Sequence, residues 1–232
     1  MSSASSGEIF FPRHRLEALS DGVFAVVMTL LVLELKLEDV PPRATDPELL
    51  HGLARLVRPL FGYAISFCLA GVFWVQQHRQ LAMTQRSNAQ HTTANLVFLF
   101  FVTLLPFSVT VYTRSAETHR IGTAVYFLNV GLIGSSLLAS WLVARRAGLV
   151  MDTVPLRRQR AFTHRLVAMS LGLLAGAAIA LQWPEFAAMG IVVVMAPIIR
   201  WSKRATAEPA AAPAAPAEAE AANPPAAPTP SP

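Results

Sequence analysis

The hydrophobic pattern begins with an apolar stretch that has acidic residues near both ends, residues 15–37, RLEALSDGVFAVVMTLLVLELKL. About a dozen residues between Asp21 and Glu34 carry no charge, whereas a lipid-exposed span needs roughly 20 apolar residues. A charge in the hydrocarbon region costs on the order of 3 kcal/mol, so membrane helices turn such residues toward a bundle interior or a cavity. The pattern therefore predicts an inner helix that faces water rather than lipid.

Five further apolar runs approach the length needed to cross a bilayer. They cover approximately Leu49 to Trp74, Ala94 to Tyr112, Thr123 to Val143, Leu166 to Leu181 and Phe186 to Trp201. Hydrophobic residues make up 53% of the sequence and charged residues 14%, which is unusual for a soluble domain. The runs lack the alternation of a membrane barrel, and lipid offers no partner for free backbone groups. We therefore expect an all-α membrane protein with six transmembrane helices.

The first predicted helix has a regular apolar face. Val26, Thr29, Leu30 and Leu33 recur at i, i+3, i+4 and i+7 and so lie on one side of it. This periodicity is typical of ordinary packing against neighbouring helices, and it also fits a face that looks into a central pathway.

Ser20 and Asp21 lie on a different side of the same helix. At about 100° per residue, Asp21 projects about 140° away from Val26. If the apolar face lines a pathway, this pair points into the surrounding helices and needs buried polar partners. Alternatively, the two residues cap a helix that begins at Gly22. Candidate partners at a similar depth are Trp74, Gln77, His78 and Asn95.

Basic residues predict the orientation in the membrane. One side would hold Arg13, Arg15, Arg79, Arg86, Arg145, Arg146, Arg157, Arg158, Arg160, Arg165, Arg200, Lys203 and Arg204. The other side would hold only Lys36, Arg43, Arg114 and Arg120, with Arg55 and Arg58 ambiguous. The positive-inside rule then places both termini in the cytoplasm of a multi-pass cell-membrane protein. The net charge of +5 is spread over several short loops, which argues against nucleic-acid binding.

The chain divides into three parts by composition. Residues 1–12 are expected to be a flexible N-terminus, residues 13–203 a six-helix domain, and residues 204–232 a disordered, Ala/Pro-rich cytoplasmic tail. Nucleophiles and metal-ligand residues do not cluster on any predicted helix, so an enzyme and a metal site are not expected. His14, His51, His91, His119 and His164 lie near helix ends or loops and are interpreted as interfacial or solvated.

Several segments in the same order resemble one family. Arg15, Leu19-Ser20-Asp21 and Ala25 are similar to the R-x-x-x-F-S-D-x-x-x-A signature of the transmembrane protein 175 potassium channels, specifically the prokaryotic members. The stretch SDGVFAVVMTLLVLEL, the segment FWVQQHR at 73–79, and Asn95 with LLPF at 104–107 extend the resemblance to roughly residues 10–202. Leu19 replaces the family's Phe, Val26 its usual Ile or Leu, and Gln77-His78 its frequent pair of histidines.

The resemblance implies a homotetramer of six-helix subunits with helix 1 lining a central pore. By position in the motif, Val26 would form the hydrophobic constriction, Thr29 a threonine layer involved in potassium selection, and Leu30 and Leu33 further apolar rings. It also implies a structural polar network that holds helix 1 against its neighbours. Its members would be Ser20 and Asp21 together with Arg15, Trp74, His78 and Asn95.

The functional prediction is a potassium-permeable channel without a TVGYG filter, a motif that the chain lacks. Potassium would be the permeant ion, no cofactor is expected, and the partners would be other copies of the chain and membrane lipid. Glu34 would either concentrate cations at the pore mouth or be a solvated carboxylate at a helix end. The alternative is a secondary transporter or proton-coupled carrier that uses Asp21 and His78, although transporter-type repeats and broken helices are not visible.

Overall fold

The computed structural model describes residues 10–36, 44–115 and 120–183 and is mostly helical there. The elements are β1 (Phe10–Phe11), α1 (Arg13–Val32), α2 (Asp46–Arg55), α3 (Val57–Ala82), β2 (Ser87–Asn88), α4 (Ala89–Thr103), α5 (Leu105–Ser115), α6 (Arg120–Arg146) and α7 (Leu156–Gln182). The sixth expected helix, Phe186 to Trp201, and the expected tail at 204–232 lie outside the described residues.

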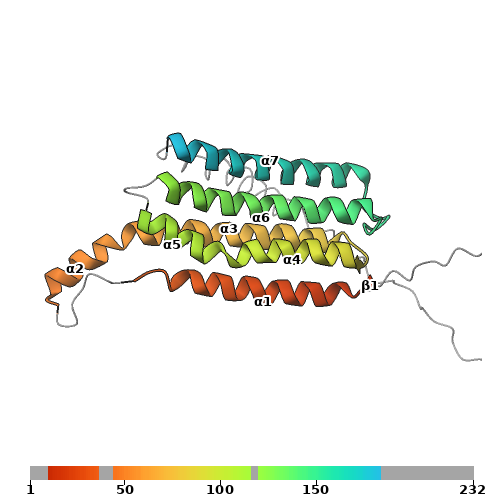
Figure 1. The fold of residues 1–232 in the computed structure, drawn as a ribbon. Coiled ribbons are helices and arrows are strands. Elements are labelled where there is room, and N and C mark those ends of the chain that lie inside the picture. Colours follow the sequence, from red (N-terminus) through yellow and green to blue (C-terminus); the bar gives the residue numbers. More distant parts are fainter. Residues whose placement is uncertain (1–9, 37–43, 116–119, 184–232) are drawn as a thin grey trace, which may run out of the picture.

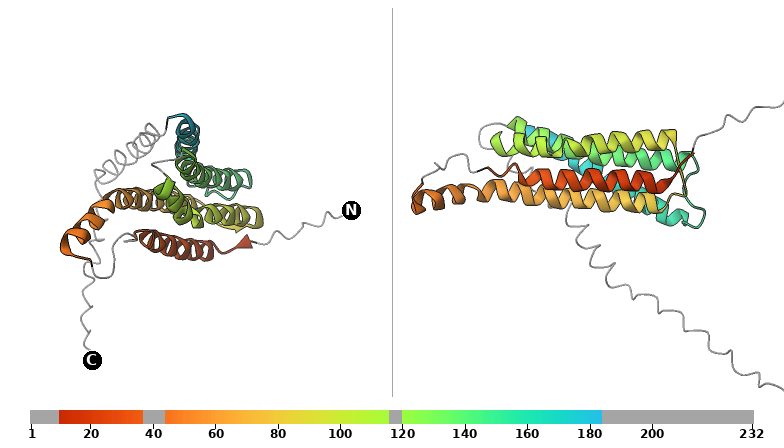
Figure 2. Two further views of the ribbon diagram at one scale, coloured as in Figure 1. Left: turned by 60° about the vertical axis from the view of Figure 1, so that its left-hand side comes forward. Right: turned by 90° about the horizontal axis from the view of Figure 1, so that it is seen from below.

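The long helices form a layered bundle. α6 packs against α7 on one side and against α4 and α5 on the other, whereas α1 packs against α3, α4 and α5. α1 and α7 therefore form opposite outer layers, with α3, α4, α5 and α6 between them (Figures 1 and 2). This arrangement leaves α1 with protein neighbours mainly on its inner side.

Small residues allow the α6–α7 layer to pack closely. A Cβ atom added at Gly176 of α7 would lie 2.8 Å from the ring of Phe127 in α6. One added at Gly131 of α6 would lie 2.6 Å from the side chain of Leu174. Glycines at such positions let two membrane helices approach each other and gain van der Waals contact.

The second expected span, Leu49 to Trp74, needs correction at both ends. Its first part forms the separate helix α2, which leans away from the bundle (Figure 1). This helix begins with a capping box between Thr45 and Glu48. The Thr45 backbone N–H and hydroxyl both bond the Glu48 carboxylate and hold its pKa below the usual range. At the other end, α3 continues to Ala82 because Gln77 and Gln80 are buried in polar contacts instead of entering a loop.

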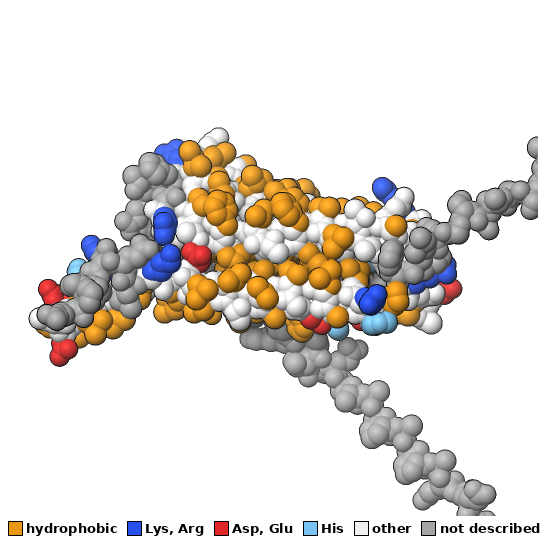
Figure 3. Space-filling model, turned by 60° about the horizontal axis from the view of Figure 1, so that its bottom comes forward, with side chains coloured by type: hydrophobic (Ala, Val, Ile, Leu, Met, Phe, Trp, Pro, Cys, Tyr) orange, Lys and Arg blue, Asp and Glu red, His pale blue; other side chains and the backbone are white. Residues whose placement is uncertain are grey.

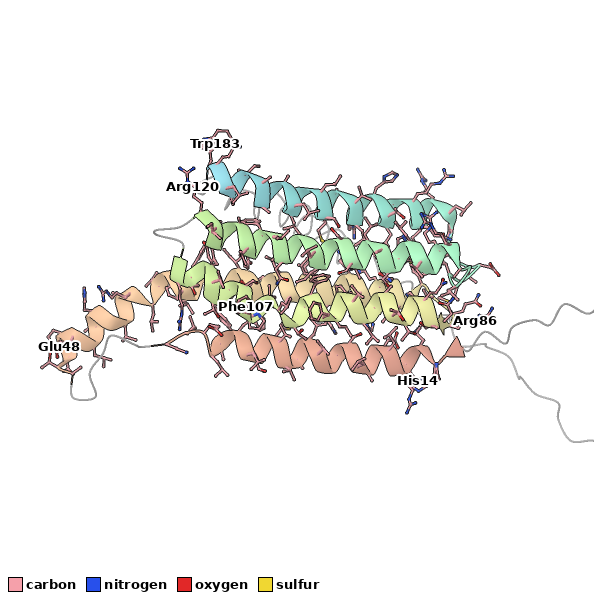
Figure 4. The ribbon with its side chains drawn as sticks, viewed as in Figure 1. His14, Glu48, Arg86, Phe107, Arg120 and Trp183 are labelled. Atoms are coloured by element: carbon pink, nitrogen blue, oxygen red, sulfur yellow. The ribbon has the colours of Figure 1, made fainter. Side chains whose placement is uncertain are left out.

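The third expected span, Ala94 to Tyr112, is interrupted at Leu104. Pro106 has no backbone N–H to bond the Val102 carbonyl, and its ring crowds that carbonyl, so α4 ends at Thr103 and α5 begins at Leu105 with the proline in its first turn. The two helices nevertheless continue in one direction, and Figure 4 places Phe107 at their junction. Together they span Ala89–Arg114 as one apolar segment.

Four segments within the described ranges are long and apolar enough to cross a membrane. They are Pro59–Ala82, Ala89–Arg114, Arg120–Arg146 and Leu156–Gln182. α1 is not among them, because its first half carries Arg13, Arg15, Glu17 and Asp21. Among the described helices, α1 thus fails these criteria because of its charges, as the hydrophobic pattern predicted, whereas α2 fails them because it is short.

The loops at one end of the bundle are joined by backbone pairing. Phe10 pairs with Asn88 and Phe11 with Ser87, and Thr84 forms a bridge with Val150. Phe10 and Phe11 thus have backbone partners, although the sequence suggested a flexible N-terminus over residues 1–12. His14 and Arg86 mark this end in Figure 4, and Glu48, Arg120 and Trp183 mark the opposite end.

Candidate functional site

The two sides of α1 differ in exposure. Leu16, Ser20, Phe24, Val27 and Leu31 are buried against the bundle. The residues of the predicted pore face lie on the other side: Val26 is 57% exposed, Leu30 42% and Leu33 63%, and Thr29 is also exposed. Figure 3 shows that hydrophobic side chains cover the middle of this side of the molecule, with Lys and Arg toward its ends. The stripe therefore does not serve as packing within the described part of the chain.

A buried polar layer joins α1 to α3 and α4. The Gln77 Nε2 donates to Ser20 Oγ at 2.7 Å and lies 3.5 Å from Asn95 Oδ1, a long and weak contact. Ser20 Oγ donates to the carbonyl of Leu16, and Asn95 Nδ2 donates to that of His91. Since Ser20, Gln77 and Asn95 are all at most 2% exposed, their polar atoms depend on these partners.

A second contact lies beside this layer, at the edge of the α1–α3 interface. Trp74 Nε1 donates to Asp21 Oδ1 at 2.8 Å, and the Trp74 ring stacks on His78 with centroids 5.9 Å apart. Asp21, Trp74 and His78 are all exposed. Trp74 is thus one of the partners expected for Asp21, but within the single chain their contact lies at the surface, because α1 is an outer helix and the residue after buried Ser20 emerges at its edge.

Arg15 does not join these contacts. Its side chain is exposed, and among the described residues it makes no hydrogen bond to the network. Arg13 anchors the beginning of α1 instead, through an ion pair with Glu17 at 2.9 Å and a hydrogen bond to the Thr84 carbonyl at 3.3 Å. The i, i+4 spacing of Arg13 and Glu17 was the available sequence signal for this pair.

A further buried polar cluster was missed by sequence reasoning. Gln80 Nε2 donates to Ser140 Oγ of α6 at 2.7 Å and lies 3.4 Å from His91 Nε2, while Ser87 Oγ lies 2.9 Å from His91 Nδ1. The interpretation of His91 as solvated or interfacial is wrong, because its side chain is completely buried. The i, i+4 pair His91 and Asn95 and the i, i+3 pair Gln77 and Gln80 were the sequence signals of two facing polar stripes.

Glu34 lies just beyond α1, toward the end opposite Arg13. It is half-buried, and its Oε2 accepts a hydrogen bond from the Thr110 hydroxyl of α5. A small cavity of about 130 Å³ adjoins it, lined also by Lys36, Pro59, Thr110, Thr113 and Arg114. The carboxylate is therefore held by α5 and is more restrained than a fully solvated helix end.

Comparison with known proteins finds bacterial relatives named potassium channels and animal relatives named "Endosomal/lysosomal proton channel TMEM175". Residues 15–106, which contain most of α1 and the polar layer of Ser20, Gln77 and Asn95, match a family profile described as "Endosomal/lysosomal potassium channel TMEM175". A potassium channel of Streptomyces collinus is 31% identical over 163 residues, covering 68% of this chain and 77% of that protein. A potassium channel of a Chryseobacterium species is 33% identical over 129 residues, covering 53% of this chain and 59% of that protein.

Two solved structures share the fold. The crystal structure of a lysosomal potassium-selective channel TMEM175 homolog from Chamaesiphon minutus has a TM-score of 0.71 at 23% identity and covers 81% of this chain and 97% of its own. The potassium channel MtTMEM175, crystallised as a variant with a nanobody fusion, has a TM-score of 0.58 at 18% identity and covers 89% of this chain and 99% of its own. At these identities the likeness concerns the fold alone.

Proposed function

This chain belongs to the TMEM175 family, and from that membership we propose that it is a potassium-permeable channel of the cell membrane. Four copies would assemble around a central axis, with α1 from each lining the pore and both termini in the cytoplasm. Closed symmetry of this kind is usual for homo-oligomers.

The observation that carries the proposal is the exposed stripe of α1. Val26, Thr29, Leu30 and Leu33 are exposed on a helix that has too much charge for a lipid-facing span. This stripe is not buried in the core of its own chain, and its helix is too charged to face lipid. Such a surface is best covered by the same helix from other copies of the chain, arranged around a pathway.

The chemistry of the stripe suits a hydrophobic gate with weak ion selection. Rings of Val26, Leu30 and Leu33 would exclude water and stop current when narrow. The Thr29 hydroxyl donates its hydrogen to the Val26 carbonyl at 2.8 Å. Because the proton is engaged by the backbone, the oxygen lone pairs would remain available to replace part of a potassium ion's hydration shell.

The polar layers would determine which side of α1 faces the axis. Ser20 can bond Gln77 only while α1 keeps its present rotation about its own axis. That rotation turns Val26 away from the α3 contact, about 120° from Ser20, because six residues at about 100° each amount to about 240° beyond one full turn. Asp21, Trp74 and His78 would lie at the edge of this contact, where a neighbouring subunit could cover them.

The test is a bi-ionic reversal potential measured on purified full-length protein in planar bilayers, with potassium on one side and sodium on the other. Discrete openings with a reversal potential displaced toward the potassium equilibrium value are expected. Thr29→Ala should reduce that displacement. Thr103→Ala is a matched control, because Thr103 of α4 is also exposed and also donates to a carbonyl three residues earlier, that of Phe100, at 2.7 Å.

Two results would count against the proposal. An unchanged reversal potential in Thr29→Ala would remove Thr29 from ion selection. Saturating flux without openings would favour the carrier that uses Asp21 and His78.

A further inference from the structure

A basic cavity lies at the β1 end of the bundle, away from α1. It has a volume of about 600 Å³ and is enclosed by the end of α3, the α6–α7 loop and the beginning of α7. Figure 1 places the end of α3 and the beginning of α7 at this same end. The lining residues are Arg79, Ala82, Met83, Met151, Thr153, Val154, Arg158, Ala161, Phe162 and Arg165.

The walls of this cavity are held in place by backbone bonds. The Met151 N–H donates to the Met83 carbonyl at 3.0 Å, and the Gln85 N–H donates to the Leu149 carbonyl at 2.9 Å. These bonds fix the α6–α7 loop against the end of α3. The cavity is therefore formed by three elements with a defined relative position.

The electrostatics of the cavity favour an anion. Arg79 from α3 and Arg158 and Arg165 from α7 contribute three positive charges, and the charges of Arg165 and Arg158 act on Arg79. The described lining contains no Asp or Glu. Apolar neighbours such as Met83 and Phe162 lower the local dielectric constant, which strengthens both the mutual repulsion of the arginines and their attraction for an anion.

We propose that this cavity binds a phosphate-bearing anion, with Arg79, Arg158 and Arg165 as its ligands. Guanidinium groups bind phosphate oxygens in a planar, bidentate manner that lysines do not match. The volume falls in the range of about 300–1,000 Å³ that is usual for small-molecule sites and exceeds the need of a single inorganic ion. A soluble phosphate ester and the headgroup of an anionic phospholipid share this chemistry.

Such a ligand would act on the part of the bundle that holds α1. Arg79 follows Gln77 and His78 in α3, and Gln77 is the residue that bonds Ser20. A phosphate bridging Arg79 to Arg158 and Arg165 would tie α7 to this segment of α3. The site does not depend on the channel proposal, and its binding can be measured without recording current.

Binding is tested on the purified full-length protein in two arms. In the first, inorganic pyrophosphate is titrated by calorimetry into protein in a neutral detergent. In the second, native mass spectrometry counts phosphatidic acid molecules retained from mixed nanodiscs that also contain phosphatidylcholine. Arg158→Gln should weaken binding about tenfold, the usual effect of losing one charge-assisted hydrogen bond.

Arg157→Gln is the matched control, because Arg157 is the preceding residue of α7, carries the same charge and does not line the cavity. If Arg158→Gln weakens pyrophosphate binding and Arg157→Gln preserves it, the result supports the proposed site and indicates a soluble ligand. The same pattern with phosphatidic acid alone supports it with a lipid headgroup. Absence of binding in both arms, or equal losses in the two variants, would overturn the proposal.

Discussion

α1 and α6 are both long helices of the same bundle, but they are held in different ways. In an 18-residue apolar stretch of α6, 61% of the residues are buried, and glycines bring this helix close to α7. α1 lies in an outer layer and makes its main specific contacts through the side chains of Ser20 and Asp21. The packing of α6 is largely completed within one chain, whereas that of α1 leaves one side open.

The two kinds of contact have different consequences. Close packing at Gly131 and Gly176 depends on shape and contributes many small dispersion terms. Hydrogen bonds such as that of Gln77 to Ser20 depend on orientation and contribute modestly, but they specify how the helix is rotated. Orientation-dependent hydrogen bonds therefore suit a helix such as α1, which must keep one particular side turned away from its own bundle.

The largest effect is expected at the α6–α7 contact. Gly176→Ala should destabilise the protein by about 1–3 kcal/mol, because the new Cβ would lie 2.8 Å from the rigid ring of Phe127. Gly22→Ala in α1 is the matched control: a Cβ there meets nothing within 4 Å, and alanine favours helix by about 0.5–1 kcal/mol. Thermal unfolding in detergent, followed by circular dichroism, measures both. Equal stability of the two variants would contradict this contrast between the helices.

A smaller loss of stability is expected when the buried polar layer of α1 is removed. Gln77→Leu eliminates the donor to Ser20 and leaves Asn95 Oδ1 without that partner. In membrane proteins such bonds contribute about 0.6 kcal/mol on average, and an unsatisfied buried group adds to the loss, so a decrease of about 1 kcal/mol is expected. Gln90→Leu in the exposed first turn of α4 is the control. Protection of α1 amides in hydrogen exchange should fall in the first variant and remain in the second.

The same contrast explains what could be predicted from the sequence. The charges around Asp21 identified α1 as unusual, and helical periodicity grouped Val26, Thr29, Leu30 and Leu33, which the structure places on one exposed side. The polar positions Ser20, Gln77 and Asn95 were recognised because few polar residues occur at that depth. Their function at a pore stays a prediction.

Helix boundaries and the second polar cluster could not be read from hydropathy. α3 continues through Gln80 because the Nε2 of this residue finds Ser140 and His91, which belong to other helices, inside the bundle. The exposure of Asp21 likewise depends on α1 being an outer layer, which is a property of the helix order in space. Arg13, and not Arg15, donates to the Thr84 carbonyl. This is a tertiary contact, and no local sequence pattern indicates which of the two arginines makes it.

The polar contact at the edge of α1 should influence assembly more than ion selection. Asp21→Asn keeps an oxygen that can accept from Trp74 Nε1, whereas Asp21→Ala removes the acceptor. We expect the alanine variant to lower the fraction of the proposed tetramer in size-exclusion chromatography with light scattering more than the asparagine variant. Both should retain the wild-type reversal potential, because Asp21 lies on a different side of α1 from Val26 and Thr29. Normal tetramers with an altered reversal potential would reverse this assignment.

The smallest effect is expected at the other end of α1. Glu34→Gln should reduce the single-channel potassium conductance modestly at low ionic strength, because the carboxylate held by Thr110 would attract cations toward the proposed pore mouth. At about 1 M salt the difference should disappear, since the screening length falls from roughly 10 Å at 0.1 M to about 3 Å. Glu48→Gln, on α2 at the same end of the bundle, makes the same change of charge and should leave conductance unaltered. Equal reductions in both variants would mean that conductance responds to the net charge of this end, and Glu34 would then have no special place at the mouth.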